Sequence, residues 1–365
     1  MKNKTKPQNY HDYLKLESLL SCQELLSNQA GEKAHDEMLF IITHQVYELW
    51  FKQILFELDS IFEVFDRDKI DESHIGVVVG RLERINEIQQ LLIDQIKILE
   101  TMTPMDFLNF RDLLTPASGF QSAQFRLIEN KFGLKNINRH GYGGVDYKSK
   151  IDKRETELVQ ESEQSLSLFD LIEQWLERTP FLVFDEFDFW DQYRVAVQRM
   201  ITKDKNIIKV NEKLPKDEKE NYLKQYKSTE KMFMSFFDEE IFSKRLESGE
   251  NRLSYKATHA ALLILLYRDQ PILHNPYRLL SKLIDLDELL TTWRYKHYLL
   301  ATRMIGRKIG TGGSVGASYL KKATSKHRIF DDLTSLTTFL IPRSDLPDLP
   351  KKVLKSLSFY YESKG

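Results

Sequence analysis

The sequence predicts an all-α protein, and three observations support this fold class. Only 15 glycines and 10 prolines occur in 365 residues, so long stretches run without helix breakers. Apolar residues in these stretches recur every three or four positions, which is the helical period. With 41% hydrophobic residues and no internal repeat or clear linker, we expect a single helical domain over residues 1–365.

Residues 36–62 predict the first long helix. The segment reads DEMLFIITHQVYELWFKQILFELDSIF and contains neither Pro nor Gly. Asp36 is a suitable N-cap, and Leu39, Ile42 and Val46 begin an apolar series at helical spacing. Because this helix is apolar around most of its circumference, we expect it to be central rather than peripheral.

The following elements are predicted in order along the chain. Helical spacing continues through residues 75–101, and DFLNFRDLLTPASGFQSAQFRLIENKFG reads as helix, turn and helix. We expect a Gly-rich loop at 132–150, a helix at 151–178, a loop or short strand in FLVFDEFDFW, apolar helices at 254–268 and 284–309, and a helical stretch in RIFDDLTSLTTFLI. Residues 203–232, dense in Lys and Glu, predict a charged helical excursion broken at Pro215.

Charge and cysteine content exclude several classes of function. Lys and Arg number 53 against 54 Asp and Glu, so the net charge of -1 gives no reason to expect nucleic acid or an anionic membrane as partner. The single cysteine, Cys22, excludes an intramolecular disulfide and a cysteine-based zinc site. The polar start and the lack of a membrane-length apolar run lead us to expect a soluble cytoplasmic protein.

Four glycines cluster in GTGGSVG, residues 310–316, and invite two catalytic readings. The string GGSVG satisfies Gly-x-Ser-x-Gly, but a nucleophile elbow joins a strand to a helix, and this cluster follows a predicted helix. A GxGxxG motif would need glycine where Val315 stands. We therefore expect neither a hydrolase elbow nor a nucleotide loop here.

His44 and His297 are singled out as two histidines within strongly apolar helices. Each shares a helical stripe with bulky apolar residues: Phe40, Tyr47 and Phe51 for the first, and Trp293, Leu300 and Met304 for the second. Taken alone, such a histidine is more often a buried neutral residue bonded to a backbone carbonyl. Two of them also permit one ligand to a haem iron and one residue facing the iron's open side. Periodicity does not show whether the stripes face each other, so both interpretations stay open.

Arg111 follows Phe107 and Phe110 on a predicted helical face. An arginine bordered by aromatic rings suits bidentate binding of a carboxylate at the edge of an apolar pocket. The residues alone favour the alternative, a surface arginine whose stem packs on the phenylalanine rings.

Five blocks of the chain together resemble the tryptophan 2,3-dioxygenase family. They are HDEMLFIITHQVYELWFKQILFELDSI, ILETMTPMDFLNFRDLLTPASGFQSAQFRLIENKFG, RLSYKA, TTWRYKHYLLATRMIGRKIGTGGS and FDDLTSLTTFLIPR, and they stand in the family's order across nearly the whole chain. The resemblance implies a multi-helix haem-binding domain of the tryptophan/indoleamine 2,3-dioxygenase type, with non-covalent haem b and a homotetrameric assembly. It also implies insertion of both atoms of O2 into the indole C2–C3 bond of L-tryptophan, which gives N-formyl-L-kynurenine, the first step of the kynurenine pathway.

The resemblance also implies roles for individual residues. His297 in RYKHYL matches the proximal ligand of the haem iron, and His44 in THQVYELW matches the distal catalytic histidine that hydrogen-bonds the indole N–H. Arg111 in FLNFRD matches the arginine that pairs with the substrate carboxylate, and Thr311 in GTGG contacts the substrate's amino-acid end. The other matched positions are Phe40, Phe107 and Leu14 in the apolar pocket, Tyr10 and Tyr13 near the substrate from a neighbouring subunit's N-terminus, and Ser118 over the haem.

The glycine cluster departs from the family pattern at three positions. The family often reads GTGGSSG, an aromatic residue and later Tyr-Leu-Arg, where this chain has Val315, Ala317 and Lys321. These changes bear on the packing of the loop more than on the chemistry. Two other functions are consistent with the same motifs, namely oxygenation of a different indole and a haem sensor without turnover. Retention of Arg111 and Thr311 argues against a substrate that lacks the amino-acid end.

Overall fold

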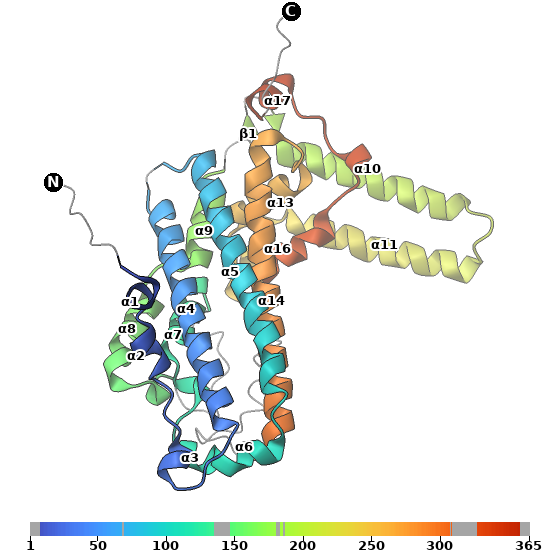
Figure 1. The fold of residues 1–365 in the computed structure, drawn as a ribbon. Helices are drawn as coiled ribbons and strands as arrows, with labels where there is room; N and C mark the ends of the chain where they lie inside the picture. The colour runs from blue at the N-terminus through green and yellow to red at the C-terminus, as the bar shows by residue number, and fades with distance from the viewer. Residues whose placement is uncertain are drawn as a thin grey trace, which may run out of the picture.

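The computed structural model describes residues 8–67, 69–134, 147–179, 183–184, 187–306, 308 and 327–357. Regular structure in these ranges is almost entirely helical (Figure 1). The exception is a pair of two-residue strands, β1 (Val183–Phe184) and β2 (Phe187–Asp188), which pair in antiparallel fashion. The predicted all-α fold class is confirmed. No helix among the described residues is both long enough and apolar enough to cross a membrane.

Three long helices, α4 (Glu37–Phe65), α5 (Glu72–Leu99) and α14 (His274–Ile305), run alongside one another (Figure 1). The side-chain amide of Asn86 on α5 donates to the carbonyl of Lys282 on α14 at 3.0 Å. On the other side of α5, the hydroxyl of Tyr47 on α4 donates to the carbonyl of Leu92 at 2.5 Å. The start of α4 therefore lies at the same end of the bundle as the last turns of α5 and α14.

Among the described helices, α13 (Tyr255–Leu266) is buried around its whole circumference, from Ala257 to Leu266 with only Leu265 partly exposed. We expected α4 to take this central place, and that expectation is wrong. Ile42, Leu49 and Phe56 on α4 are 44%, 51% and 66% exposed, and they recur every seven residues along one face. The apolar residues of α4 therefore divide between the core and the surface of the single chain.

The predicted helix at 151–178 is in fact two helices, α8 (Lys153–Gln164) and α9 (Leu168–Glu177). Ser167 starts the second helix, since its hydroxyl accepts from the Asp170 amide at 3.3 Å while the Asp170 carboxylate accepts from the Ser167 amide at 3.0 Å. This reciprocal capping box satisfies two backbone donors that the break exposes.

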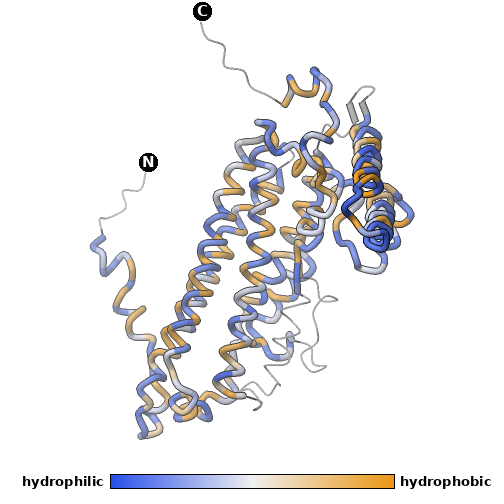
Figure 2. The backbone as a smooth tube through the Cα atoms, turned by 90° about the vertical axis from the view of Figure 1, so that its right-hand side faces the viewer, coloured by the Kyte–Doolittle hydropathy of each residue, from blue (hydrophilic) through white to orange (hydrophobic). Residues whose placement is uncertain are grey.

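Helices α10 (Phe189–Val210) and α11 (Lys216–Phe236) form a hairpin that projects sideways from the bundle (Figure 1). Pro215 is the N-cap of α11, so the break falls where proline predicted it. Hydrophobic and hydrophilic residues alternate along the bundle helices, and the hairpin, seen end-on, also carries both kinds (Figure 2). The core residues described in the hairpin lie toward its base and as far along α10 as Ile201, and they include Tyr193, Phe233 and Phe236.

Shorter elements complete the described part of the chain. They are α1 (Tyr10–Leu14), α2 (Leu16–Leu20), α3 (Leu26–Gln29), α6 (Pro104–Arg111), η1 (Asp112–Leu114), η2 (Gly119–Gln121), α7 (Ala123–Phe132), η4 (Tyr147–Lys150), α12 (Glu239–Glu247), η5 (Pro271–Leu273), α16 (Asp331–Ser335), η6 (Leu336–Phe339), η7 (Arg343–Asp345) and α17 (Lys351–Leu357).

Candidate functional site

An aromatic cluster lies where α4 and α6 meet at one end of the bundle. The ring of Phe40 lies 5.8 Å from that of Phe107 and 5.6 Å from that of Phe110, centroid to centroid. Phe110 is fully buried, and Met304 near the end of α14 packs against the same cluster. Three helices distant in sequence therefore build one apolar region, as aromatic residues that bury large areas commonly do.

His44 lies one turn after Phe40 on α4, and its ring centroid is 4.1 Å from that of Phe40. Its Nδ1 lies 2.7 Å from the Phe40 carbonyl oxygen. A carbonyl only accepts, so Nδ1 carries the proton and Nε2 is left as an acceptor. The residue keeps exposed surface. Even so, the surrounding protein desolvates the ring, and this desolvation lowers the pKa of His44. The hydrogen bond to the Phe40 carbonyl raises the pKa by a smaller amount. The ring is therefore neutral at pH 7 and accessible from outside.

His297 lies on α14 with its ring half-buried and its Nδ1 buried without a hydrogen-bond partner. Burial, and secondarily the charge of His44, lowers the pKa of His297 to about 4. A neutral imidazole is the form that binds a metal. With Nδ1 enclosed, Nε2 is the nitrogen available to a ligand.

The two histidine stripes face each other. Tyr47 on α4 and Trp293 on α14 lie 6.2 Å apart, and Trp293 lies 5.3 Å from His297. A proton on His44 disfavours one on His297, so the two imidazoles are close enough to interact electrostatically. The contacts thus show that the two stripes lie next to each other, which helical periodicity alone did not show.

Arg111 is the last residue of α6, one turn after Phe107, so both project from the same face. Its side chain is 17% exposed, and Nη1 donates to the Asp112 carboxylate at 3.2 Å. Asp112 is 90% exposed and adjacent in sequence, so this surface contact is weak. Arg111 therefore lies at the end of the helix that carries Phe107 and Phe110 of the aromatic cluster, and its carboxylate-binding role stays a prediction.

The remaining predicted site residues are not joined to the two histidines by described contacts. Ser118 caps η2, where its hydroxyl accepts from the Phe120 amide at 3.4 Å. Tyr10, Tyr13 and Leu14 lie on α1, a helix without buried residues, and are 74%, 72% and 40% exposed. Thr311 and the glycine cluster lie outside the described residues.

Two features were missed from the sequence. A buried ion-pair network of Arg126, Glu129 and Arg294 joins α7 to α14 beside Trp293, and spacing along the chain gives no signal for such a pairing. His259 on α13 is a third histidine within a strongly apolar helix, so singling out only two was wrong. Its place in THAALLILL was visible in the sequence. It is 2% exposed and lies outside the aromatic cluster of α4 and α6.

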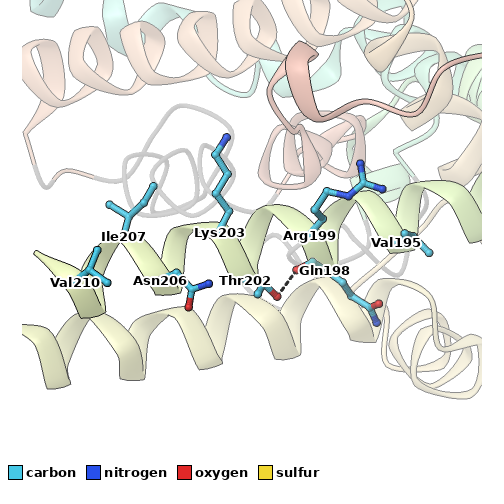
Figure 3. A pocket seen from close by; sticks show the side chains of 8 residues that line it. All are labelled: Val195, Gln198, Arg199, Thr202, Lys203, Asn206, Ile207 and Val210. Carbon is cyan, nitrogen blue, oxygen red and sulfur yellow. Dashed lines mark hydrogen bonds between the residues drawn. The ribbon is translucent and has the colours of Figure 1, made fainter.

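A groove on the hairpin offers less chemistry than the histidine region. Eight residues of α10 line it: Val195, Gln198, Arg199, Thr202, Lys203, Asn206, Ile207 and Val210 (Figure 3). All come from one helix, and the Thr202 hydroxyl is engaged with the Gln198 carbonyl of the same helix at 2.7 Å. No group of His, Cys, Asp and Glu suited to hold a metal ion occurs among the described residues.

Comparison with known proteins identifies the family of the chain. The family model of tryptophan 2,3-dioxygenase matches residues 1–340. A tryptophan 2,3-dioxygenase of Bdellovibrio bacteriovorus is 53% identical over 97% of this chain and 99% of its own length. Those of Dictyostelium discoideum and Alteromonas mediterranea are 48% and 43% identical, over 96% and 99% of this chain and 88% and 100% of their own lengths. The chain belongs to the tryptophan 2,3-dioxygenase family.

Proposed function

We propose that this chain is a haem-dependent dioxygenase that inserts both atoms of O2 into the indole C2–C3 bond of L-tryptophan and yields N-formyl-L-kynurenine. The observation that carries the proposal is the pair of neutral imidazoles, His44 and His297, on facing helices beside an aromatic cluster. Family membership over nearly the whole chain supports the same reaction.

The residues present fit a haem. His297 supplies a neutral imidazole with its Nδ1 buried, and Trp293 and Met304 give its surroundings the apolar character that a flat macrocycle needs. No cysteine pair for covalent attachment exists, so the group would be held by the ligand bond and by packing. His297 would hold the iron, with Ser118 over the ring as the family pattern implies. When bound, the haem supplies the chemistry that activates O2.

The indole is held by the residues on the other side. Nε2 of His44 is an acceptor because Nδ1 donates to the Phe40 carbonyl, and an indole N–H is a donor that matches it. Phe40 and Phe107 offer ring faces to the flat indole. A neutral His44 orients the substrate without removing its proton. Because both oxygen atoms end in the product, no external reductant is consumed.

The amino-acid end of the substrate is the part that selects tryptophan among indoles. Arg111 at the border of the aromatic cluster pairs with the carboxylate, and Thr311 contacts the same end, as the family pattern implies. A planar guanidinium binds a carboxylate through two parallel hydrogen bonds, which fixes the direction as well as the distance. The indole is thereby held in one orientation between Arg111 and His44.

We further propose a homotetramer in which a neighbouring N-terminus completes each site, with each chain as one domain. Tyr10 and Tyr13 are exposed on a helix with no buried residue, which leaves them free to reach another subunit. The exposed apolar stripe of Ile42, Leu49 and Phe56 supports an assembly that covers it. Light scattering with size-exclusion chromatography tests this, and a monomer at micromolar concentration would contradict it.

A direct test of the activity is the near-ultraviolet absorbance of N-formylkynurenine after tryptophan and air are added to the dithionite-reduced protein. Steady product formation is expected. A Soret band without product would indicate a haem sensor, and turnover of indole or another indole derivative in preference to tryptophan would indicate a different substrate. A colourless sample that haemin does not reconstitute would exclude the haem.

A further inference from the structure

A buried ion-pair network holds α14 one turn before His297. Arg294 on α14 donates to the carboxylate of Glu129 on α7 at 2.7 Å and to the backbone carbonyl of His327 at 2.9 Å. Arg126 on α7 donates to the same carboxylate at 2.6 Å. Arg294, Glu129 and Arg126 are 3%, 2% and 4% exposed. Two charged guanidinium groups and one carboxylate are thus withdrawn from water where the two helices meet.

Such a network fixes geometry rather than adding stability. Removing charges from water costs several kcal/mol per ion by order of magnitude, so apolar residues of similar volume would often serve stability as well. A guanidinium, however, donates through a rigid fork in fixed directions. By engaging Glu129 and His327 at once, Arg294 ties this turn of α14 both to α7 and to the chain segment that begins at His327.

The orientation of the His297 ring depends on how α14 is held against α7. Its Nδ1 has no hydrogen-bond partner, so no bond of its own fixes the ring. Its aromatic neighbour is Trp293, whose centroid lies 5.3 Å away. Trp293 in turn lies 5.1 Å from Phe125 of α7, within the contact that Arg294 fastens. Any rotation of α14 against α7 therefore moves the tryptophan and the imidazole together.

We propose that Arg294 and Glu129 form a positioning pair for His297, which aims the imidazole across the space that it shares with His44. The pair acts through α14, the helix that carries His297. This inference rests on the proposed function, in which His297 ligates the iron.

The test is Arg294→Lys in the haem-loaded enzyme. Lysine keeps the positive charge but lacks the planar guanidinium that donates to Glu129 and to His327 at once. Release of haem to excess apomyoglobin is expected to accelerate on the order of 10-fold, the range seen when outer partners of a metal ligand are removed. The iron–histidine stretching band of the ferrous enzyme is expected to shift or broaden.

Arg252→Lys is the matched control. Arg252 resembles Arg294 in bridging two acceptors, the backbone carbonyls of Ile329 and Gly133 at 3.0 and 2.8 Å, although it is half-buried where Arg294 is buried. It stands before α13 and not on α14. Its replacement is expected to lower the melting temperature by a similar amount while haem release and the iron–histidine band stay as in the unmodified enzyme.

Equal haem release and equal bands in the two variants would overturn the proposal and leave the pair with a structural role alone. If Arg294→Lys does not fold, Glu129→Gln tests the same contact from α7 with the same two readouts. His297→Ala tests the ligand assignment separately from the positioning pair. Retention of haem in that variant would refute the ligand assignment itself, whereas its loss together with an unchanged Arg294→Lys would refute only the positioning pair.

Discussion

Two histidines of this molecule make the same local bond in opposite surroundings. His44 on α4 and His259 on α13 each place Nδ1 2.7 Å from the carbonyl four residues earlier. His259 is 2% exposed and lies among aromatic rings, with Trp190 at 4.1 Å and Tyr255 at 4.0 Å. His44 is exposed and faces a second imidazole. The Nδ1 hydrogen bond therefore does not distinguish the roles of the two histidines. The groups that surround Nε2 do.

The closed surroundings leave His259 nothing to bind. Its Nε2 is buried without a partner, and burial lowers the pKa of His259 to about 4. A neutral ring that fills space among Trp190, Phe236 and Tyr255 fastens the base of the α10–α11 hairpin to α13. The region around His44, in contrast, combines the acceptor Nε2 of His44, the imidazole of His297 and the nearby helix that carries Arg111. Four changes test this contrast, from the largest expected effect to the smallest.

The largest effect is expected from His297→Ala. Removal of the proposed iron ligand should abolish the Soret band of the purified protein, because packing alone holds an unligated haem poorly. The matched change is His259→Gln in the closed region, which should keep the ratio of haem to protein. Full haem content in His297→Ala would show that His297 is not the iron ligand and that the two histidine regions do not differ in this way.

Arg111→Ala should raise the KM for L-tryptophan on the order of 100-fold, because loss of a desolvated partner of a carboxylate costs roughly 2 to 5 kcal/mol. Steady-state kinetics over a range of tryptophan concentrations measures it. Arg199→Ala, in the groove on α10, serves as the control and should leave the KM unchanged. An unaltered KM in Arg111→Ala would exclude the carboxylate role.

His44→Ala should keep the haem and lower kcat/KM by about tenfold, close to the worth of one hydrogen bond to the indole N–H. Absorbance gives the haem content and product formation gives the rate, both on the same sample. Loss of haem instead would mean that the assignment of the two faces is reversed.

The smallest effect on activity is expected from His259→Gln, which changes the pH dependence of stability instead. The pKa of His259 lies at about 4 in the folded chain against an ordinary value of 6.5. The unfolded chain therefore takes up a proton that the folded chain excludes, and stability falls as the pH drops from about 6.5 to about 4. The loss reaches roughly 3 kcal/mol at the end of that range. Glutamine does not titrate, so urea unfolding at several pH values should show a flatter decline; identical slopes would contradict the assignment.

The fold was predictable because helical spacing and capping residues are local. The break before α9 was also readable, since Ser167 and Asp170 in SLSLFD have the spacing of a capping box. The wrong placement of α4 has a different origin. Spacing shows that Leu49 and Phe56 are apolar, but not that this face of the helix is left uncovered within one chain.

The site was predictable in part for the same reason. The stripes of Phe40 with His44 and of Phe107 with Arg111 follow from spacing within single helices. Spacing within helices does not show which helices meet. Glu129 and Arg294 are 165 positions apart, and only the packing of α7 on α14 makes them partners.

The pairing of α5 with α14 has a consequence for the order of folding. The bond from Asn86 to Lys282 spans 196 positions, and Tyr47 meets Trp293 across an even longer stretch of chain. Contacts of such high sequence separation form late, since closing a long loop costs entropy before any contact repays it. A chain still emerging from the ribosome has α4 and the aromatic cluster of α6 long before it has α14. Under the proposed function, capture of haem would follow the docking of α14, and a chain truncated before α14 would lack the proposed iron ligand His297.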